Sequence, residues 1–451
     1  MPNPETETLA HPLGLAEQFP PFTSHEAAVE ANRCLFCYDA PCTHACPTHI
    51  DIPRFIKKIS TDNLIGSARA IFEANLLGAT CARVCPVQEL CEGACVLGSD
   101  HKPIMIVRLQ RYAMDYAYRR GIDRIQDIIK LAPSTGRSIA VIGSGPAGLS
   151  CAGELARLGH RVTIFEKRNL AGGLSTYGII ALREPIEASL AETRMIESLG
   201  VRLETGGELG QDLRLDDLQT RFDAVFLGVG LGATPAMGIP GEEFILDGLE
   251  YIERSKIEGA RMKVGRNVAV IGAGNTAIDC ATIAKRLGAD RVTMIYRRSA
   301  NEMTAYPHES EFIRKEGVEF LFLTQPQSVL VEDGWVAGLK CVRIELGPPD
   351  ESGRSAPLPI EGSEFIVPAD EVVKAVGQEK PSLAKILGLG TQRGFIKVSA
   401  DFETSIPGVF AGGDCIRAAN AASTVMAVED GKLAAAAIHR RIINSSEAQH
   451  G

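Results

Sequence analysis

The sequence of 451 residues contains no apolar run near the roughly 18 residues of a membrane-spanning helix. The segment from Met1 to Gln18 also lacks the basic start and apolar core of a secretory signal. Basic residues are in deficit, with 47 Lys and Arg against 56 Asp and Glu and a net charge of −9. We therefore expect a cytoplasmic protein with no nucleic-acid and no membrane partner.

Cysteine, by contrast, is abundant and unevenly distributed. Eight of the 12 cysteines lie between residues 34 and 95. In a reducing compartment these thiols are not expected to form disulfides. We therefore interpret this segment as a metal-binding domain.

The spacing of these cysteines favours iron–sulfur clusters. The first group is Cys34-x2-Cys37-x4-Cys42-x3-Cys46-Pro47, and the second is Cys81 followed by Cys85-Pro86-x4-Cys91-x3-Cys95. Thiolates suit both iron–sulfur clusters and zinc, and eight of them supply two four-ligand sites. Zinc ribbons usually use paired Cys-x2-Cys motifs, and the chain has one, whereas a cysteine directly before proline is typical of ferredoxins. Zinc and unliganded thiols are the alternatives.

The stretch from Ser138 to Gly148 predicts a dinucleotide-binding site. A strand of apolar residues leads into Gly143, Gly145 and Gly148, and a helix over residues 146–158 follows. In this fingerprint the glycines make the turn, let a pyrophosphate approach the backbone and let the helix pack on the strand. Glu166 ends the next strand, where a carboxylate can accept from both ribose hydroxyls of an adenosine. An ordinary glycine turn is the alternative.

The pattern that begins at Ile139 recurs from Val268, which predicts a second dinucleotide site. Gly272 and Gly274 take the places of Gly143 and Gly145, but Tyr296 stands where the first copy has Glu166. Loss of the acid and the presence of Arg297 and Arg298 favour a 2′-phosphate, and hence NADP over NAD. The alternative is that both arginines lie on a solvated turn, and NAD is not excluded.

Near the end of the chain, Gly413 and Asp414 follow a predicted strand. Asp414 is expected to hold a ribityl or phosphate-side hydroxyl. An Ala-rich helix from about residue 423 to 443 follows, and its N-terminus, which includes Thr424, is expected to face the flavin ring. Considered alone, these features are a surface acid and a packing helix.

The predicted fold is α/β, with two Rossmann-like domains, one inserted in the other, preceded by an α-helical iron–sulfur domain. We expect residues 1–135 to form the helical domain with two [4Fe-4S] clusters. Residues 136–250 and 371–451 should form the FAD domain, re-entered at Glu371–Gly377, and residues 251–370 the NAD(P)H domain. Within the last, residues 309–367 are expected to alternate short strands and turns, with a hairpin at 347–359.

Together these motifs resemble the flavoproteins with two dinucleotide-binding domains. Residues 25–451 are similar to two groups: dihydropyrimidine dehydrogenase, through its N-terminal half and its bacterial small subunit, and the small subunit of NADPH-dependent glutamate synthase. The cysteine pattern resembles that of the pyrimidine reductase throughout. That resemblance implies one cluster on Cys34, Cys37, Cys42 and Cys95. It implies another on Cys46, Cys85, Cys91 and Gln110, with Cys81 as a thiol that is not a ligand.

The resemblance also implies cofactor contacts. For the flavin it implies Gly145, Ala147, Glu166, Gly173, Leu174, Arg183 and Asp414, and the motifs described above add Gly143, Gly148, Gly413 and Thr424. For the nicotinamide nucleotide it implies Ala273, Gly274, Asn275, Thr276, Arg297 and Arg298, and the second motif adds Gly272. Where the mammalian-type enzyme has a further arginine for the 2′-phosphate, this chain has Thr304, which weakens the prediction of NADP.

We therefore expect an electron-input subunit that takes hydride from NADPH or NADH onto FAD and passes electrons through two [4Fe-4S] clusters. No catalytic side chain is required, because positioning carries the hydride step. The expected partner is an FMN-containing catalytic subunit with ferredoxin-type clusters, in a hetero-oligomer that reduces uracil or thymine. The alternative is a small subunit of glutamate synthase or a similar complex, and a nucleotide-binding protein without turnover is a third possibility. The chain has no Cys-x2-Cys after Gly274, which disfavours a disulfide reductase.

Overall fold

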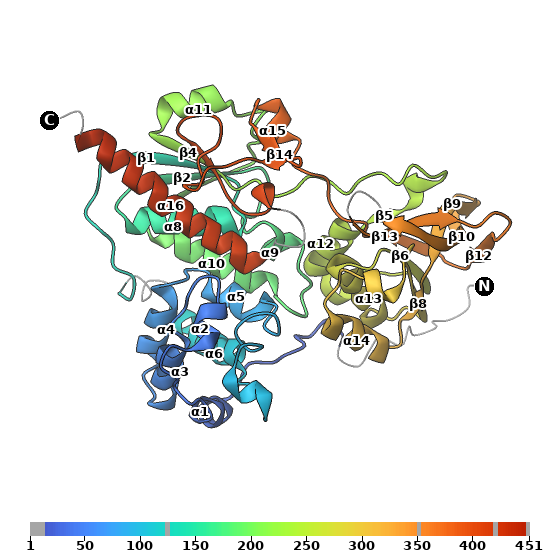
Figure 1. Ribbon diagram of the computed structural model, residues 1–451, viewed down its shortest axis with the longest axis horizontal. Helices are drawn as coiled ribbons and strands as arrows, with labels where there is room; N and C mark the ends of the chain where they lie inside the picture. The colour runs from blue at the N-terminus through green and yellow to red at the C-terminus, as the bar shows by residue number, and fades with distance from the viewer. Residues whose placement is uncertain (1–13, 122–126, 350–352, 418–422, 448–451) are drawn as a thin grey trace. The chain divides into compact units, whose positions relative to one another are not determined.

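The computed structural model describes residues 14–121, 127–349, 353–417 and 423–447 (Figure 1). The chain forms two compact units. The larger unit comprises Phe19–Thr176, Arg183–Gly232 and the chain from Lys380 onward, and the smaller unit comprises Tyr177–Leu182, Ala233–Glu379 and the segment that ends at Gln18. Within the described ranges, no helix is long and apolar enough to cross a membrane.

The larger unit begins with short helices that carry the cysteines. Their N-termini are capped by side chains: Thr23 and Glu26 form a capping box, and Asp51 and Asn63 accept from backbone N–H groups in the first turns of their helices. The N-cap of the first helix is therefore Thr23. The helices are α1 (Ser24–Asn32), α2 (Pro41–Ala45), α3 (Ile52–Ser60), α4 (Leu64–Phe72), α5 (Gly78–Val84), η1 (Val96–Ser99) and α6 (Ile106–Arg119).

These helices share one continuous core with the first α/β sheet. Ile52, Phe55, Ile56 and Ile59 recur on one face of α3 and are all buried. The core runs from this helical part through the strand β1 and into the C-terminal helix. From Phe19 onward, the predicted iron–sulfur domain is thus packed as part of the larger unit, and one apolar core continues across the predicted boundary at residue 135.

The first sheet is parallel, in the order β16-β4-β1-β2-β3. The chain leaves β1 toward β2 on one side and later returns on the other side at β4, so the carboxyl end of β1 is a topological switch point, where ligands bind in such sheets. The strands are β1 (Ser138–Ile142), β2 (Arg161–Glu166), β3 (Arg202–Thr205), β4 (Ala224–Leu227) and β16 (Val409–Ala411).

Helices cover this sheet, and the long α16 crosses over α8 (Figure 1). The crossing is close, because a Cβ on Gly431 of α16 would lie 2.2 Å from the carbonyl oxygen of Ala147 in α8. The remaining elements of the larger unit are α8 (Pro146–Arg157), α9 (Leu174–Tyr177, whose last residue belongs to the smaller unit), α10 (Ile186–Ser198), α11 (Leu215–Arg221), α15 (Leu383–Ile386), β14 (Thr391–Gln392), β15 (Phe395–Ile396), η5 (Asp414–Ile416) and α16 (Thr424–Glu447).

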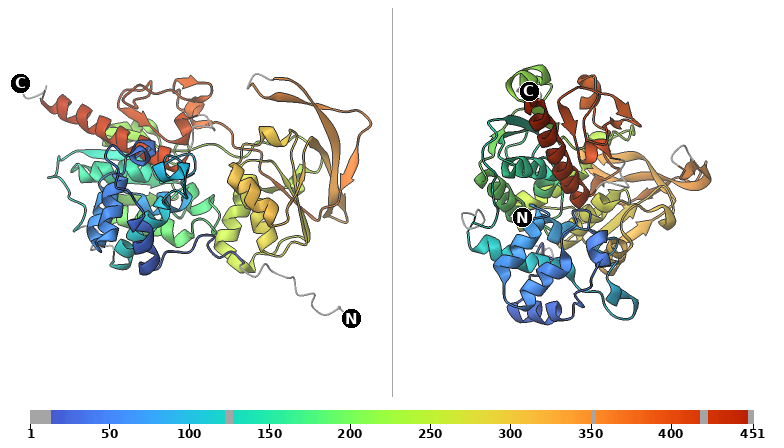
Figure 2. Two further views of the ribbon diagram at one scale, coloured as in Figure 1. Left: turned by 60° about the horizontal axis from the view of Figure 1, so that its bottom comes forward. Right: turned by 60° about the vertical axis from the view of Figure 1, so that its left-hand side comes forward.

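The smaller unit repeats this parallel sheet in the order β5-β13-β6-β7-β8. A long antiparallel ribbon of β9 and β10, orange in Figure 2, adds β11 and β12. The elements are η2 (Glu242–Phe244), β5 (Leu246–Asp247), α12 (Gly248–Glu258), η3 (Gly259–Arg261), β6 (Asn267–Ile271), α13 (Asn275–Arg286), β7 (Arg291–Ile295), η4 (Ala300–Glu302), α14 (Pro307–Lys315), β8 (Glu319–Leu321), β9 (Thr324–Glu332), β10 (Trp335–Pro349), β11 (Ser355–Pro359), β12 (Phe365–Val367) and β13 (Glu371–Lys374).

Two sequence expectations for this unit were wrong. Residues 309–315 belong to helix α14, which Pro307 begins at its first helical position, rather than to a strand or turn. Glu371–Lys374 does not re-enter the first domain, because β13 pairs with β6 and β5 of the second sheet. The inserted unit accordingly spans 233–379 rather than 251–370. Strand partners far apart in sequence leave no local signal of which sheet a short apolar strand joins.

Candidate cofactor sites

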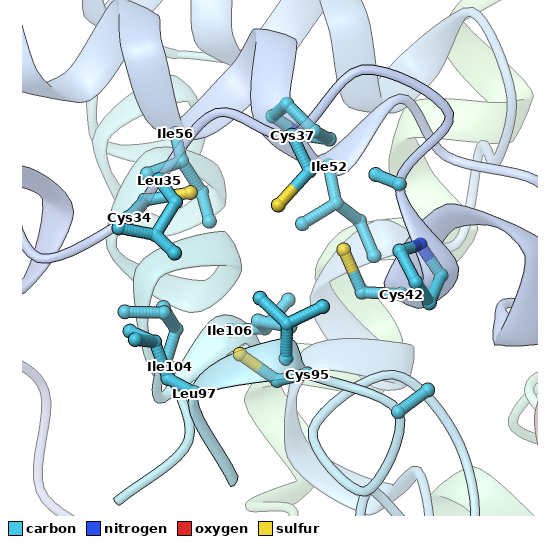
Figure 3. A pocket seen from close by; sticks show the side chains of 15 residues that line it. Cys34, Leu35, Cys37, Cys42, Ile52, Ile56, Cys95, Leu97, Ile104 and Ile106 are labelled. Carbon is cyan, nitrogen blue, oxygen red and sulfur yellow. The ribbon is translucent and has the colours of Figure 1, made fainter. Parts of the chain in front are cut away.

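Four of the predicted cluster ligands line one pocket in the helical part of the larger unit (Figure 3). Cys34 and Cys37 come from the loop after α1, Cys42 from α2, and Cys95 from the residue before η1. Ile52 and other apolar side chains from α3, from the loop before α6 and from the start of α6 complete the lining. The structure therefore brings together three thiols of the first cysteine group and one of the second.

Burial and neighbouring thiols disfavour the anionic form of these cysteines. Burial raises the pKa of Cys42 to about 11, with Cys34 and Cys95 adding to the shift. The pKa of Cys34 is raised for the same reasons, with burial the largest cause and Cys37 and Cys95 contributing. Thiolates at this site therefore need a compensating positive charge, which a bound metal supplies as it displaces the protons.

The second predicted ligand set lies deeper. Cys46 and Cys91 are buried, and burial raises the pKa of Cys91, with Glu92 and Cys46 contributing. The thiol of Cys85 is hydrogen-bonded to Cys81, and this bond and burial raise the pKa of Cys85, with further contributions from Cys91 and Cys46. The structure thus brings Cys46, Cys85 and Cys91 together and places the thiol of Cys81, the one expected not to be a ligand, beside them.

Gln110, the predicted fourth ligand of this set, is buried on α6. Its Nε2 donates to the backbone carbonyl of Gly78 at 2.7 Å. This bond fixes the side-chain amide at the start of α5 and leaves Oε1 as the atom available to a metal. Its role as a ligand stays a prediction.

The four thiols in Figure 3 surround an apolar space. Among the residues that the structure describes, no three His, Cys, Asp or Glu side chains are grouped so that they could hold a metal ion. The choice of iron–sulfur over zinc therefore rests on the cysteine spacing.

The first glycine motif forms a tight turn at the switch point of the first sheet. Gly143 has φ +93°, and a Cβ there would lie 2.5 Å from the carbonyl oxygen of Gly228. A Cβ on Gly148 would lie 1.9 Å from the carbonyl oxygen of Gly143, so glycine is required at both positions. Gly145 is the N-cap of α8, and the nearest atom to a Cβ there is 3.9 Å away. The space at Gly145 is therefore open to a ligand, as the fingerprint requires.

Glu166 is buried at the end of β2 and faces this turn. Its Oε2 accepts from the backbone N–H of Ser144 at 2.9 Å and from the Ser144 hydroxyl at 2.5 Å, while Oε1 accepts from the backbone N–H of Arg168 at 2.8 Å. The carboxylate is thus fixed beside the glycine turn and keeps unused lone pairs for ribose hydroxyls. Ser144, which the sequence analysis did not single out, holds both Glu166 and the loop at Gly172.

Asp414 lies at the predicted flavin edge, directly after Gly413. Burial raises its pKa, and Asp430 adds to the shift. The N–H of Gly413 donates to Asp430 at 3.0 Å, and Arg417 pairs with the same carboxylate. Asp430 and Arg417 were not predicted from the sequence, although the polar run Glu429–Gly431 inside an Ala-rich helix was a signal that this turn has a special role.

The remaining predicted flavin residues lie on three segments of the larger unit. Ala147 is buried in the first turn of α8, and Leu174 begins α9 with 39% of its surface exposed. Arg183 is half-buried just before α10, and Thr424 is the first residue of α16. Their contacts with a flavin stay predictions.

The second motif reproduces the first in the smaller unit. Gly272 has φ +134°, and a Cβ there would lie 2.2 Å from the carbonyl oxygen of Ala375. Gly274 is the N-cap of α13, and a Cβ there would lie 3.2 Å from Thr304 Oγ1. Asn275 accepts from the backbone N–H of Tyr306 at 3.3 Å. These bonds, and one from Ala305 to the carbonyl of Ala273 at 3.2 Å, hold the loop that carries Thr304 against the motif.

The two arginines expected at the 2′-phosphate have different environments, so the prediction that both of them bind the phosphate changes. Arg297 is exposed, whereas Arg298 is buried and its Nε donates to the carbonyl of Ser355 at 2.8 Å. Arg298 is therefore part of the packing between the end of β7 and β11, which the linear sequence does not reveal. Tyr296 is half-buried, and its hydroxyl donates to the carbonyl of Glu302 at 2.7 Å.

Two family models together match nearly the whole chain. Residues 14–122 match the iron–sulfur domain described as dihydropyrimidine dehydrogenase domain II, 4Fe-4S cluster. Residues 137–436 match the pyridine nucleotide-disulphide oxidoreductase model.

Named relatives also match most of the chain. The chain is 34% identical to the glutamate synthase [NADPH] small chain of Escherichia coli over 94% of its own length and 93% of that protein. It is 37% identical to the NADP(+)-dependent formate dehydrogenase subunit beta of Moorella thermoacetica, over 88% of this chain but 59% of that longer protein. The solved structure of Mycobacterium tuberculosis FprA in complex with NADPH has a similar fold, with a TM-score of 0.56 at 19% identity over 70% of this chain and 86% of that one.

These comparisons confirm the predicted fold class and cofactor types. An α/β fold with FAD- and NAD(P)-type Rossmann domains follows an N-terminal iron–sulfur domain, and FAD, a [4Fe-4S] centre and NAD(P)H are its cofactors. The number of clusters stays a prediction. Reduction of a pyrimidine finds no support among these relatives, which favour the glutamate synthase alternative.

Proposed function

The chain belongs to the pyridine nucleotide-disulphide oxidoreductase family, in the group that carries an N-terminal iron–sulfur domain and includes the small chain of glutamate synthase. From that premise we propose that it is the electron-input subunit of a larger oxidoreductase. It accepts hydride equivalents from NADPH at the smaller unit and delivers single electrons to a partner protein from the cluster domain.

The observation that carries this proposal is that the expected flavin site and the thiol pocket share one apolar core. The glycine turn at Gly143 and the pocket of Cys34, Cys37, Cys42 and Cys95 belong to one packed unit with a continuous apolar core. Bound FAD supplies the conversion of a two-electron hydride into single electrons, which is the chemistry that iron–sulfur centres need. A fixed spacing between the two sites is what stepwise electron transfer requires.

The residues of this chain act by binding and orienting. The open space at Gly145 admits the pyrophosphate of FAD, Glu166 holds the adenosine ribose, and Asp414 binds a hydroxyl of the flavin chain. Gly274 and the first turn of α13 hold the pyrophosphate of NADPH, and the exposed Arg297 pairs with the 2′-phosphate. No side chain serves as a nucleophile or a general acid, because a hydride transfer needs neither.

Electrons leave the chain at the pocket of Figure 3. Leu35 and Tyr38 lie on the cysteine loop with exposed fractions of 61% and 100%, and Val96, next to Cys95, is 44% exposed. An apolar surface beside the four thiols suits contact with a partner protein that holds the next redox centre. We infer that the partner is a glutamate synthase-type subunit or a similar catalytic subunit, since the small chain that matches over nearly its whole length belongs to such a complex.

Two measurements test this proposal. Anaerobic NADPH should bleach the flavin absorbance of the purified chain and then reduce its iron–sulfur centre. A chain that binds NADPH and FAD without flavin reduction would overturn the proposal. Purification of the tagged chain from its source cell should then retain a large amidotransferase-type subunit, whereas retention of an FMN-containing barrel subunit would instead support a pyrimidine reductase.

A further inference from the structure

A buried carboxylate joins the flavin domain to the helix that precedes the second ligand set. Glu192 of α10 is fully packed, with an exposed fraction of 1%. Its Oε1 accepts from the backbone N–H groups of Ala79 at 2.7 Å and of Thr80 at 3.1 Å. Both donors lie in the first turn of α5, whose own N-cap residue, Leu77, provides no side-chain cap. Glu192 of α10 therefore supplies the side-chain cap that α5 lacks within its own segment.

This carboxylate sits in a polar network between a predicted cluster ligand and a predicted flavin contact. On one side, Gly78 accepts from the amide of Gln110 at 2.7 Å. On the other side, the Thr80 hydroxyl donates to Glu184 at 2.5 Å, and Glu184 follows Arg183, which is expected at the flavin. The C-cap of the same short helix is Cys85, whose backbone N–H donates to the Cys81 carbonyl at 3.3 Å. The hydrogen bonds around α5 therefore connect Glu192 with the helix turn that holds Gln110 and with Glu184.

The surroundings of Glu192 shift its change of protonation state to about pH 8. Burial raises its pKa to about 8, and the nearby Glu184 carboxylate adds to the shift, while the hydrogen bonds from Thr80 and Ala79 oppose it. The half-buried Tyr118 of α6 also faces it. Two cations act on Tyr118 in turn: Arg83, which pairs with Asp115 at 2.7 Å, and Arg194 of α10.

We propose that Glu192 is a positioning residue that couples the arrival of an electron on the second cluster to the uptake of one proton. This inference rests on the proposed function. A bound reduced flavin would supply the electron and, on its oxidation, a proton. The Glu192 carboxylate takes one proton and forms one O–H bond, so the added negative charge on the cluster is compensated nearby.

The test is the reduction potential of the second cluster, followed by EPR during redox titrations of the complete FAD-loaded chain between about pH 6 and pH 9. In the wild-type protein the potential should fall as the pH rises above about 8, where Glu192 is a carboxylate in the oxidised protein and reduction takes up a proton. The Glu192→Gln variant keeps an oxygen that can cap α5 but cannot bind the proton, so its potential should no longer vary with pH. Glu187→Gln, an exposed acid on the same helix, is the matched control and should behave like the wild type.

A second variant keeps the test decisive if Glu192→Gln does not fold. Glu184→Gln removes the neighbouring charge that raises the pKa of Glu192, so the pH-dependent region should move to lower pH. A potential that does not vary with pH in a wild-type chain holding both clusters would overturn this inference alone. A chain that holds no second cluster would overturn both the inference and the two-cluster part of the proposed function.

Discussion

A Cβ on Gly173 would lie 2.6 Å from the α-carbon of Gly145, so the two backbones are in direct contact. The contact joins the glycine turn after β1 to the loop after β2, two segments that helix α8 and strand β2 separate along the chain. Gly173 has φ +57°, and a side chain there would be both strained and blocked. The pair therefore forms one wall of the expected flavin site.

Substitution of Gly145 and of Gly274 should separate the two nucleotide sites. Neither position meets backbone within 3 Å of an added Cβ, so valine at either one should leave the fold intact. Gly145→Val should weaken FAD binding by about a hundredfold, or roughly 3 kcal/mol, because its methyl groups occupy the approach of the pyrophosphate. Gly274→Val should keep FAD and lose its reduction by NADPH. Equal loss of FAD from two well-folded variants would contradict this assignment.

The two thiol sets should each hold one cluster, for about eight irons per chain. Cys42→Ala should abolish the cluster at the pocket of Figure 3, and Cys91→Ala should abolish the other one. Each variant should retain about four irons and one EPR signal. Cys341→Ala is the control, because Cys341 is a buried core thiol of the smaller unit and should not affect the iron content. Four irons in the wild type would mean that the set with Gln110 holds no cluster.

Arg297 should carry the preference for NADPH. Its guanidinium is exposed and can form charge-assisted hydrogen bonds with a phosphate dianion. Arg297→Ala should lower kcat/KM for NADPH by about ten- to a hundredfold, or about 1.5–3 kcal/mol, and leave NADH almost unchanged. Steady-state kinetics with both coenzymes decides the point, and a wild-type protein tenfold better with NADH would contradict it.

Arg298→Ala should have a different effect. The guanidinium of Arg298 is buried on the Ser355 carbonyl, so its loss should lower the free energy of unfolding by about 1–3 kcal/mol. Thermal unfolding of the two arginine variants, measured without coenzyme, should show a lower midpoint for Arg298→Ala alone. A stable Arg298→Ala protein with a selective loss of NADPH would restore this residue to the phosphate site.

Asp430 should slow the release of FAD, although it does not bind the flavin directly. Its carboxylate holds the N–H of Gly413 and the guanidinium of Arg417, and it is fully buried. Asp430→Asn should weaken both bonds and let the Gly413–Asp414 turn move, so the protein should release FAD faster on dilution. Asp401→Asn removes an exposed partner of Arg440 and should have no effect on FAD. Equal FAD release from both variants would contradict the role of Asp430.

The linear sequence determined the parts of this protein whose signals are local. A buried strand, three spaced glycines and an acid at the next strand end all fall between Ser138 and Glu166, because one β-α-β unit binds a pyrophosphate through its own backbone. The repeat at Gly272 follows from the same local chemistry. Cysteine spacing likewise identified the metal type, since thiolates next to proline are typical of iron–sulfur ligation.

Only the tertiary structure decided which distant groups meet. Arg297 and Arg298 are neighbours in sequence, yet the ribbon strand β11 buries one of them, and no local pattern encodes that contact. The short strand β13 pairs with β6 of the second sheet, and β6 lies far away along the chain. Asp430 beneath Gly413 and Glu192 on the N-terminus of α5 serve backbone groups of other elements. Such contacts depend on which faces pack together, and packing is a property of the whole chain rather than of any one segment.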